Sequence, residues 1–236
     1  MSDAATAVLD AHGREALERV LDLLAADPRS LSAVRDPNRA WDVHVADALA
    51  ALEVAEVKAA VRLADLGAGA GFPGLPLALA LPAAQVDLIE SVRRKADFID
   101  EAIRATGIDN ARAIAARSEE WSREAPPAGG REAYDVVAAR AVGPLVLVAE
   151  LASPLLQEGG VLVAWKGERN AREEEALAAE AAALAMATER VVPVRPYPAS
   201  RNRHLHVVRK AGPTPPGLPR RPGVAAKRSR SRRRTS

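Results

Sequence analysis

The spacing of hydrophobic positions changes along the chain and divides it into two parts. Over residues 4–26 apolar residues recur at helical spacing, and a second helix is predicted over 38–53. Short apolar strands and amphipathic helices then alternate through most of the remaining sequence, which is the pattern of βαβ units. Because a βαβ unit joins parallel strands through a helix, we expect an α/β fold with a mostly parallel sheet and an N-terminal helical extension.

The alternating region predicts seven strands and four helices. Only residues 196–202 separate the last two strands, which is too few for a crossover helix, so these strands should form an antiparallel hairpin. A sheet that ends in this way resembles that of class I S-adenosylmethionine-dependent methyltransferases. The strands are expected at 61–66, 85–90, 111–116, 134–139, 160–165, 189–195 and 204–210, and the helices at 73–81, 92–106, 144–156 and 170–187.

The most distinctive local sequence follows the first strand, where glycine occupies every second position. Gly67, Gly69 and Gly71 allow the backbone to turn tightly and to approach a ligand where a Cβ would collide. Pro73 suits a first helical turn, because its missing N–H would have no intrahelical partner there. A glycine loop between a strand and a helix is typical of a nucleotide-cofactor site, although a glycine-rich turn without a ligand is the simpler alternative.

Two cofactors compete for this loop. Residues 69–74 satisfy the G-x-G-x-x-G pattern of dinucleotide-binding folds, which favours NAD. Glu90, at the end of the second strand, could accept hydrogen bonds from both ribose hydroxyls of either NAD or S-adenosylmethionine. Asp65 favours S-adenosylmethionine, because a carboxylate would repel a pyrophosphate but attract an ammonium and a sulfonium group. The loop alone therefore favours S-adenosylmethionine and leaves NAD open.

Composition limits the class of protein further. A chain of 236 residues with 48% hydrophobic content can bury one complete α/β core. It contains no cysteine, which excludes disulfides, a thiolate nucleophile and zinc–thiolate sites, and we expect no metal. Residues 1–13 do not have the pattern of a secretion signal, and no apolar run is long enough to span a bilayer. We therefore expect a cytoplasmic protein that is not bound to a membrane.

Basic residues are concentrated at the C-terminus. The net charge is +2, and from Pro213 onward there are eight basic residues and no acidic ones, so the rest of the chain carries −6. With five prolines and no apolar periodicity, residues 212–236 are predicted to form a disordered basic tail behind a Rossmann-like domain at 57–211 and a helical extension at 1–56. The tail could raise affinity for RNA, or it could only increase solubility.

Several segments together are similar to one family. In order along the chain, they resemble the bacterial 16S ribosomal RNA guanine-N7 methyltransferases, called RsmG or GidB, over about residues 5–210. The resemblance implies an S-adenosylmethionine-dependent enzyme that methylates N7 of a guanine in 16S rRNA, within the 30S subunit or an assembly intermediate, and acts as a monomer. It rests on Arg35-Asp36-Pro37, Gly71-Phe72-Pro73-Gly74, Ala139-Arg140-Ala141, Lys166-Gly167 and Arg203-His204-Leu205.

The resemblance also implies roles for individual residues. Gly67 and Phe72 would line the methionine and ribose side of the cofactor, Glu90 the ribose, and Ser118 and Glu119 the adenine. From the residues alone, Phe72 could instead be a core aromatic, and Ser118 could be a helix N-cap. The expected cofactor-binding set is Asp65, Gly67, Gly69, Gly71, Phe72, Glu90, Ser118, Glu119 and Arg140.

Arg140 and Lys166 are the candidate catalytic residues, expected to orient the guanine or nearby phosphates. Arg140 lies between apolar neighbours, and because a buried unpaired charge is costly we expect a partner such as Asp65, Glu90 or a ligand group.

His44 and Asp47, three positions apart on the second predicted helix, could face each other or the site. The family has an arginine before this histidine and a serine after this aspartate, where the present chain has Val43 and Ala48.

Two other functions stay open on the residues alone. An NAD-dependent oxidoreductase would use the same glycine loop for a different cofactor. A non-catalytic RNA-binding or ribosome-assembly protein would bind RNA through the basic tail and would leave the loop at 67–71 without a purpose.

Overall fold

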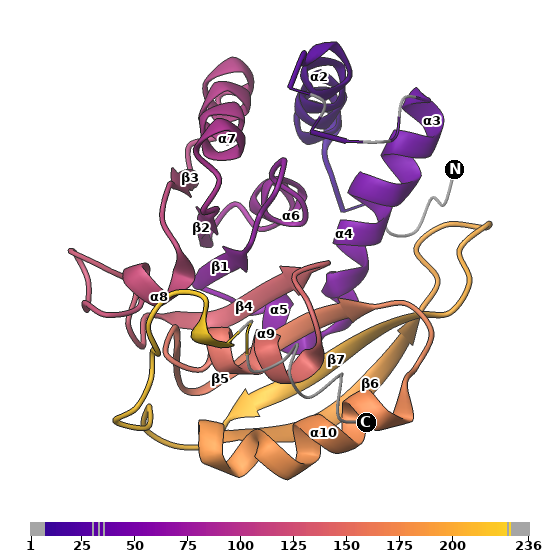
Figure 1. Ribbon diagram of the computed structural model, residues 1–236. Helices are drawn as coiled ribbons and strands as arrows, with labels where there is room; N and C mark the ends of the chain where they lie inside the picture. The colour runs from indigo at the N-terminus through magenta and orange to yellow at the C-terminus, as the bar shows by residue number, and fades with distance from the viewer. Residues whose placement is uncertain (1–7, 30, 33, 35, 226, 228–236) are drawn as a thin grey trace.

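A seven-stranded sheet forms the centre of the molecule. The computed structural model describes residues 8–225 and 227, except 30, 33 and 35. The strand order is β3-β2-β1-β4-β5-β7-β6, and β7 runs antiparallel to both β5 and β6, while β1 to β5 are parallel (Figure 1). The class I methyltransferase sheet with its terminal hairpin is thereby confirmed. The strands are β1 (Arg62–Leu66), β2 (Gln85–Ile89), β3 (Ala111–Ile114), β4 (Tyr134–Arg140), β5 (Leu156–Lys166), β6 (Met186–Val194) and β7 (Arg203–Lys210).

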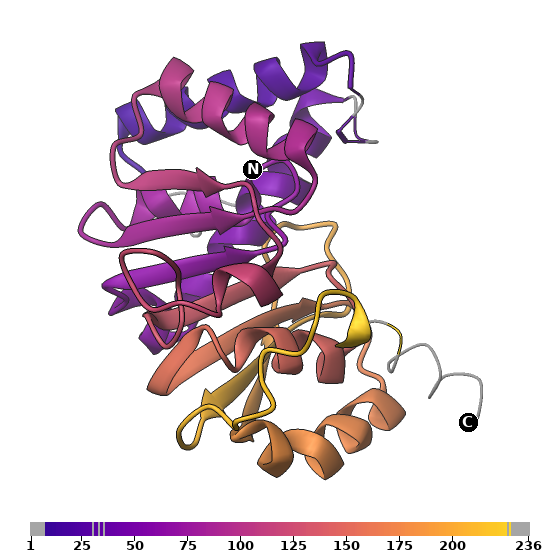
Figure 2. The ribbon, with the colours of Figure 1, turned by 60° about the vertical axis from the view of Figure 1, so that its left-hand side comes forward.

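Helices cover both faces of this sheet, because successive strand residues point to opposite sides. Leu63 and Val136 join a core with α2 (Ala11–Ala26), α6 (Gly74–Ala80) and α7 (Arg93–Thr106). Their neighbours Ala64 and Val137 join a second core with α9 (Leu145–Ala152) and α10 (Ala171–Ala181). Figure 2 shows the two helical layers on either side of the strands. Within the described residues, no helix is long and apolar enough to cross a membrane.

The second predicted helix is interrupted. Its range contains α3 (Pro37–Ala40), the wider π-helical turn η1 (Trp41–Ala46), α4 (Asp47–Leu49) and the 3-10 turn η2 (Ala50–Glu53), followed by α5 (Ala55–Lys58). Val45 and Leu49 are fully buried in the same core as Leu63, so the N-terminal extension packs directly on the sheet. A π-helical turn often marks a functional site, and this one carries His44.

Two predicted boundaries on the far side of the sheet are wrong. α9 ends at Ala152 and not at 156, because Pro154 has no N–H for a helical hydrogen bond and its ring would clash with the carbonyl four residues earlier. α10 ends at Ala181, and β6 begins at Met186 after the 3-10 turn η3 (Ala182–Leu184), inside the range predicted as helix. The alanine-rich sequence contains no helix-breaking residue there. Pairing of Met186 with Lys210 on β7 ends the helix.

The segment after β7 also departs from expectation. The described residues 212–225 pack on the domain, whereas disorder was predicted for 212–236. Leu218 and Ala225 are buried, and Lys210 Nζ donates to Thr214 Oγ1 at 2.8 Å. The two buried apolar side chains and the hydrogen bond hold the segment on the domain, although its low hydrophobicity predicted disorder. The last nine residues, 228–236, lie outside the described residues.

Candidate cofactor site at the strand ends

The glycine loop joins β1 to α6 and has the tight geometry predicted for it. Gly67, Gly69 and Gly71 have φ values of 73°, 62° and 92°, a region that L side chains rarely adopt. A Cβ on Gly71 would lie 2.5 Å from Leu75 Cδ1, and one on Gly67 would lie 3.0 Å from Val142 Cγ2. The backbone conformation therefore requires glycine at all three positions, and at two of them neighbouring side chains also leave little room.

Asp65 holds the start of α6. Its Oδ2 accepts a hydrogen bond from the Gly74 N–H at 2.7 Å, and a Cβ on Gly74 would lie 2.8 Å from that oxygen. No donor among the described residues meets the other oxygen, Oδ1, although the residue is fully buried. Burial raises the pKa of Asp65 to about 7, while the Arg140 charge acts against this rise. An unpartnered buried oxygen beside the glycine loop fits a ligand that brings its own donor.

Glu90 connects the end of β2 to the glycine loop. Oε2 accepts from the Gly69 N–H at 2.9 Å and Oε1 accepts from the Val92 N–H at 2.7 Å. Each carboxylate oxygen has a second lone pair, so both can still accept from a diol. The carboxylate is thereby fixed by backbone donors in a position suited to ribose hydroxyls.

A cavity of about 200 Å³ opens beside this loop, at the ends of the first strands. Three of the residues expected to contact the cofactor line it, namely Gly67, Ser118 and Glu119. Ser118 is not a helix N-cap, because Arg117 occupies that position before α8 (Ser118–Trp121). Sequence reasoning missed several lining residues, chiefly the apolar Ile89, Val142, Leu147 and Leu151 and the distant Gly223. Apolar walls with a few polar groups at one end suit a purine ring.

Phe72 is a core residue. It is 5% exposed, belongs to the cluster under α6, and stacks on His44 with ring centroids 4.9 Å apart. His44 Nε2 lies 3.0 Å from Ser32 Oγ, and burial lowers its pKa to about 4, so the ring is neutral at physiological pH. The core alternative for Phe72 is confirmed, and its contact with the cofactor stays a prediction.

Arg140 has a different partner from those expected. Its Nη1 donates to Asp47 Oδ2 at 3.0 Å and to the carbonyl oxygen of Val43 at 2.9 Å, so the prediction of Asp65 or Glu90 was wrong. Only the backbone of Val43 takes part in this contact. Asp47 is therefore brought to the site, on the side of β4 and β5.

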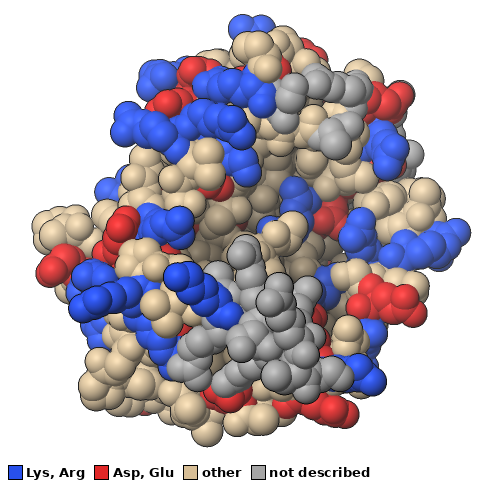
Figure 3. Space-filling model, in the orientation of Figure 1, with Lys and Arg blue, Asp and Glu red and all other residues tan. Residues whose placement is uncertain are grey.

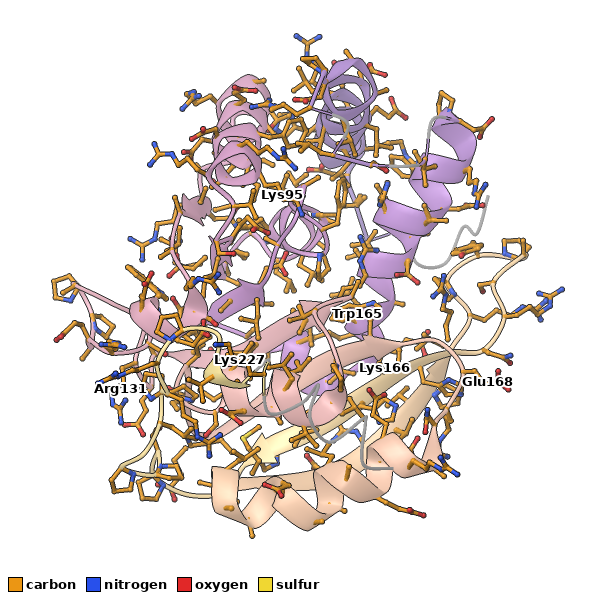
Figure 4. All side chains as sticks on the ribbon, viewed as in Figure 1. Lys95, Arg131, Trp165, Lys166, Glu168 and Lys227 are labelled. Atoms are coloured by element: carbon orange, nitrogen blue, oxygen red, sulfur yellow. The ribbon has the colours of Figure 1, made fainter. Side chains whose placement is uncertain are left out.

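Lys166 is held at the end of β5. Its Nζ donates to the carbonyl oxygen of Gly143 and to Glu173 Oε1, both at 2.9 Å. The neighbouring Trp165, labelled in Figure 4, lies beside Lys166 on β5. Its Nε1 donates to the carbonyl oxygen of Asp47 at 2.9 Å. Lys166 thus joins the segment after β4 to α10, and a role in orienting the substrate stays a prediction.

Basic residues surround the hollow visible on this face. Figure 3 shows the hollow at the centre of the view and Lys and Arg side chains gathered above it over α7. Lys95 of α7 lies at its upper margin, and Lys166 and Lys227 lie below it (Figure 4). Arg93 and Arg94, which open α7, are exposed. Positive charge around a hollow suits the phosphates of a nucleic acid.

S-adenosylmethionine fits this site, which offers the glycine loop, the carboxylates of Asp65 and Glu90 and the largely apolar cavity. Asp65 Oδ1 could accept from its ammonium group, Glu90 from its ribose, and the cavity beside Ser118 and Glu119 could take its adenine. The NAD alternative requires a pyrophosphate close to the buried Asp65, which is unfavourable once that carboxyl is ionised.

Comparison with known proteins agrees with this geometry. Residues 15–205 match the family model described as rRNA small subunit methyltransferase G (GidB). Curated relatives with that name include one from Pelotomaculum thermopropionicum, 39% identical over 84% of this chain and 82% of its own, and one from Deinococcus radiodurans, 38% identical over 89% and 83%.

Solved structures extend the likeness to the fold. The fibrillarin pre-rRNA processing protein of Methanococcus jannaschii superimposes with a TM-score of 0.56 at 18% identity, over 73% of this chain and 77% of its own. A predicted O-methyltransferase from Agrobacterium tumefaciens gives a TM-score of 0.53 at 24% identity, over 71% and 81%.

Proposed function

Since this chain belongs to the rRNA small subunit methyltransferase G family, and is therefore an S-adenosylmethionine-dependent rRNA methyltransferase, we propose that it methylates N7 of a guanine in 16S rRNA. The choice of N7 as the methylated atom is supported by the side chain at the end of β4. That side chain is Arg140, a cation that cannot accept a proton. The nearby histidine, His44, has a pKa of about 4 and stacks on Phe72. The two other functions considered, NAD-dependent oxidation and RNA binding without catalysis, find no support in the comparisons.

Guanine N7 is suited to a site of this kind. It carries an in-plane lone pair that is used neither in base pairing nor in aromaticity, so it can attack a methyl group without first losing a proton. S-adenosylmethionine, when bound, supplies that methyl group on a sulfonium. The work left to the protein is to align the two reactants and to accommodate the charge that moves onto the purine.

We assign the alignment to two sets of side chains. Asp65, Glu90 and the loop at 67–71 would fix the cofactor, with Ser118 and Glu119 at its adenine end. Arg140 would orient guanine O6 or an adjacent phosphate, because a guanidinium held by Asp47 presents its remaining donors in a fixed direction. Lys166 would contribute positive charge at the neighbouring strand end. The target base would leave its stack to reach the site.

The substrate particle is the second part of the proposal. We propose that the enzyme acts as a monomer on 16S rRNA within the 30S subunit or an assembly intermediate. The basic residues around the hollow support this, because a structured RNA presents phosphates on several sides at once.

Labelled S-adenosylmethionine and unmodified 30S subunits test the proposal, with free 16S rRNA as a parallel substrate. We expect label in one guanine, recovered as 7-methylguanosine by mass spectrometry of the digested RNA, and faster transfer to the particle. Label on another base or another guanine atom would contradict the assignment to N7. Faster transfer to free 16S rRNA would contradict the assignment to the particle.

A further inference from the structure

The described residues beyond β7 return to the cofactor cavity. We call residues 213–225 the C-terminal strap. It lies outside the part of the chain that matches the family model, which ends at residue 205. In Figure 2 this yellow segment turns back from the end of β7 and reaches α8 and α9 with a short helical turn, and Figure 1 shows the same arrangement.

The strap is fastened to the domain by a partly buried ion pair and two apolar side chains. Arg220 Nη1 lies 2.5 Å from Glu150 Oε2, and Glu150 is a residue of α9 that is only 7% exposed. Leu218 and Ala225 are buried on either side of this pair, and Arg131 Nη1 donates to the carbonyl oxygen of Leu218 at 3.2 Å. Because Glu150 would otherwise be a buried unpaired charge, Arg220 is the anchor whose loss should loosen the strap most.

The C-terminal end of the strap forms part of the cavity wall. Gly223 lines the cavity, and its N–H donates to Glu119 Oε1 at 2.9 Å. Its φ is +80°, a conformation that favours glycine, and this geometry turns the N–H toward Glu119. The strap therefore adds a wall at the end of the cavity formed by Ser118 and Glu119, and it fixes the orientation of the Glu119 carboxylate.

We propose that the C-terminal strap is part of the S-adenosylmethionine-binding site and covers the adenine end of the cofactor. The proposal rests on the placement of that cofactor in this cavity. A docked strap removes more of the adenine from water and keeps Glu119 in place before binding, so both effects strengthen binding. By reciprocity, the bound cofactor stabilises the docked strap by the same factor.

Full-length point variants test the proposal by isothermal titration calorimetry with S-adenosylmethionine. Arg220→Ala should weaken binding by about tenfold, a typical coupling between two linked equilibria. Arg221→Ala is the matched control, because it removes the same charge from the adjacent, exposed residue and should leave Kd unchanged. Equal affinity of the wild type and Arg220→Ala, or tighter binding by the variant, would overturn the proposal.

Hydrogen exchange on the wild-type protein provides a second readout that does not depend on a variant. Addition of S-adenosylmethionine should slow exchange at the amides of the non-proline residues within 218–225, including that of Gly223. Unchanged exchange at saturating cofactor would overturn the proposal even if Arg220→Ala failed to fold. Failure of the wild type to bind the cofactor at all would instead contradict the placement of S-adenosylmethionine itself.

Discussion

The two sides of the site are built in different ways. On the β1 and β2 side, Asp65 and Glu90 are fixed by backbone N–H groups, those of Gly74 at the start of α6, Gly69 in the loop and Val92 after β2. On the β4 and β5 side, Arg140 and Lys166 are held by ion pairs with Asp47 and Glu173, together with the backbone carbonyl oxygens of Val43 and Gly143. The backbone-built side is complete before any ligand arrives and suits an invariant cofactor. The side held by ion pairs supplies two cations, which suits a substrate that carries phosphates.

Glu90→Ala should have the largest effect on the cofactor side. The substitution removes the acceptor for both the Gly69 and the Val92 N–H groups and also the proposed ribose ligand. Each lost bond to a charged acceptor costs about 1.5–3 kcal/mol, so we expect S-adenosylmethionine binding to weaken by about 100-fold or more in calorimetry. Glu90→Gln keeps one acceptor, so its affinity for S-adenosylmethionine should lie between those of the wild type and Glu90→Ala. Wild-type affinity in Glu90→Ala would instead show that Glu90 does not contact the cofactor.

Asp65 gives the cofactor side a characteristic pH dependence. Its carboxyl keeps a proton up to a pKa of about 7 in the folded protein, whereas the ordinary pKa of an aspartate side chain is 3.8. Between these values the folded state binds more protons than the unfolded state, so the stability from this group falls as pH rises, by at most about 1.4 kcal/mol per pH unit.

Asp65→Asn removes this titration and retains an acceptor for the Gly74 N–H. Urea unfolding at pH 4.5, 5.5 and 6.5 should therefore show the wild type losing stability relative to the variant as pH rises. A difference that is the same at all three values would show that Asp65 titrates normally.

A pair of glycine substitutions separates backbone strain from steric contact within the loop. Gly69 and Gly71 both have positive φ, but a Cβ on Gly69 meets no atom within 4 Å, whereas one on Gly71 meets Leu75. Gly69→Ala should lower the free energy of unfolding by about 1–2 kcal/mol from strain alone. Gly71→Ala should cost more, as measured by urea unfolding, and equal losses would mean that Leu75 moves aside freely.

Lys166→Ala should have the smallest effect. A partly exposed ion pair such as that with Glu173 contributes at most about 1 kcal/mol, so we expect methyl transfer to fall by no more than about fivefold. S-adenosylmethionine affinity should not change. A loss of 100-fold in single-turnover assays would instead place Lys166 in direct contact with the reacting groups.

The contrast between the cofactor side and the substrate side of the site also explains which features the sequence could predict. The sheet, the loop and the position of Glu90 depend on local spacing, so the seven strands along the chain, the terminal hairpin and the glycine geometry followed from the residues. The partner of Arg140 could not be found in this way, because Asp47 lies 93 residues earlier on an interrupted helix. Equally, Gly223 is about a hundred residues from Glu119, and no local pattern connects them.

Composition misled in one respect for a similar reason. Prolines and arginines beyond residue 212 are typical of disorder, but an ion pair, two buried apolar side chains and several hydrogen bonds keep residues 213–225 on the domain. These contacts depend on α9, whose position is known only once the sheet has formed.

The separation of the two sides is tested most directly by Arg140→Ala, with two readouts on one preparation. Calorimetry would give the Kd for S-adenosylmethionine, and single-turnover transfer to unmodified 30S subunits would give the rate. We expect Kd to stay within about twofold while the rate falls by about 100-fold, as when one positioned donor is removed. A rate that is unchanged, or a Kd that weakens as much as the rate falls, would contradict the assignment of Arg140 to the substrate side.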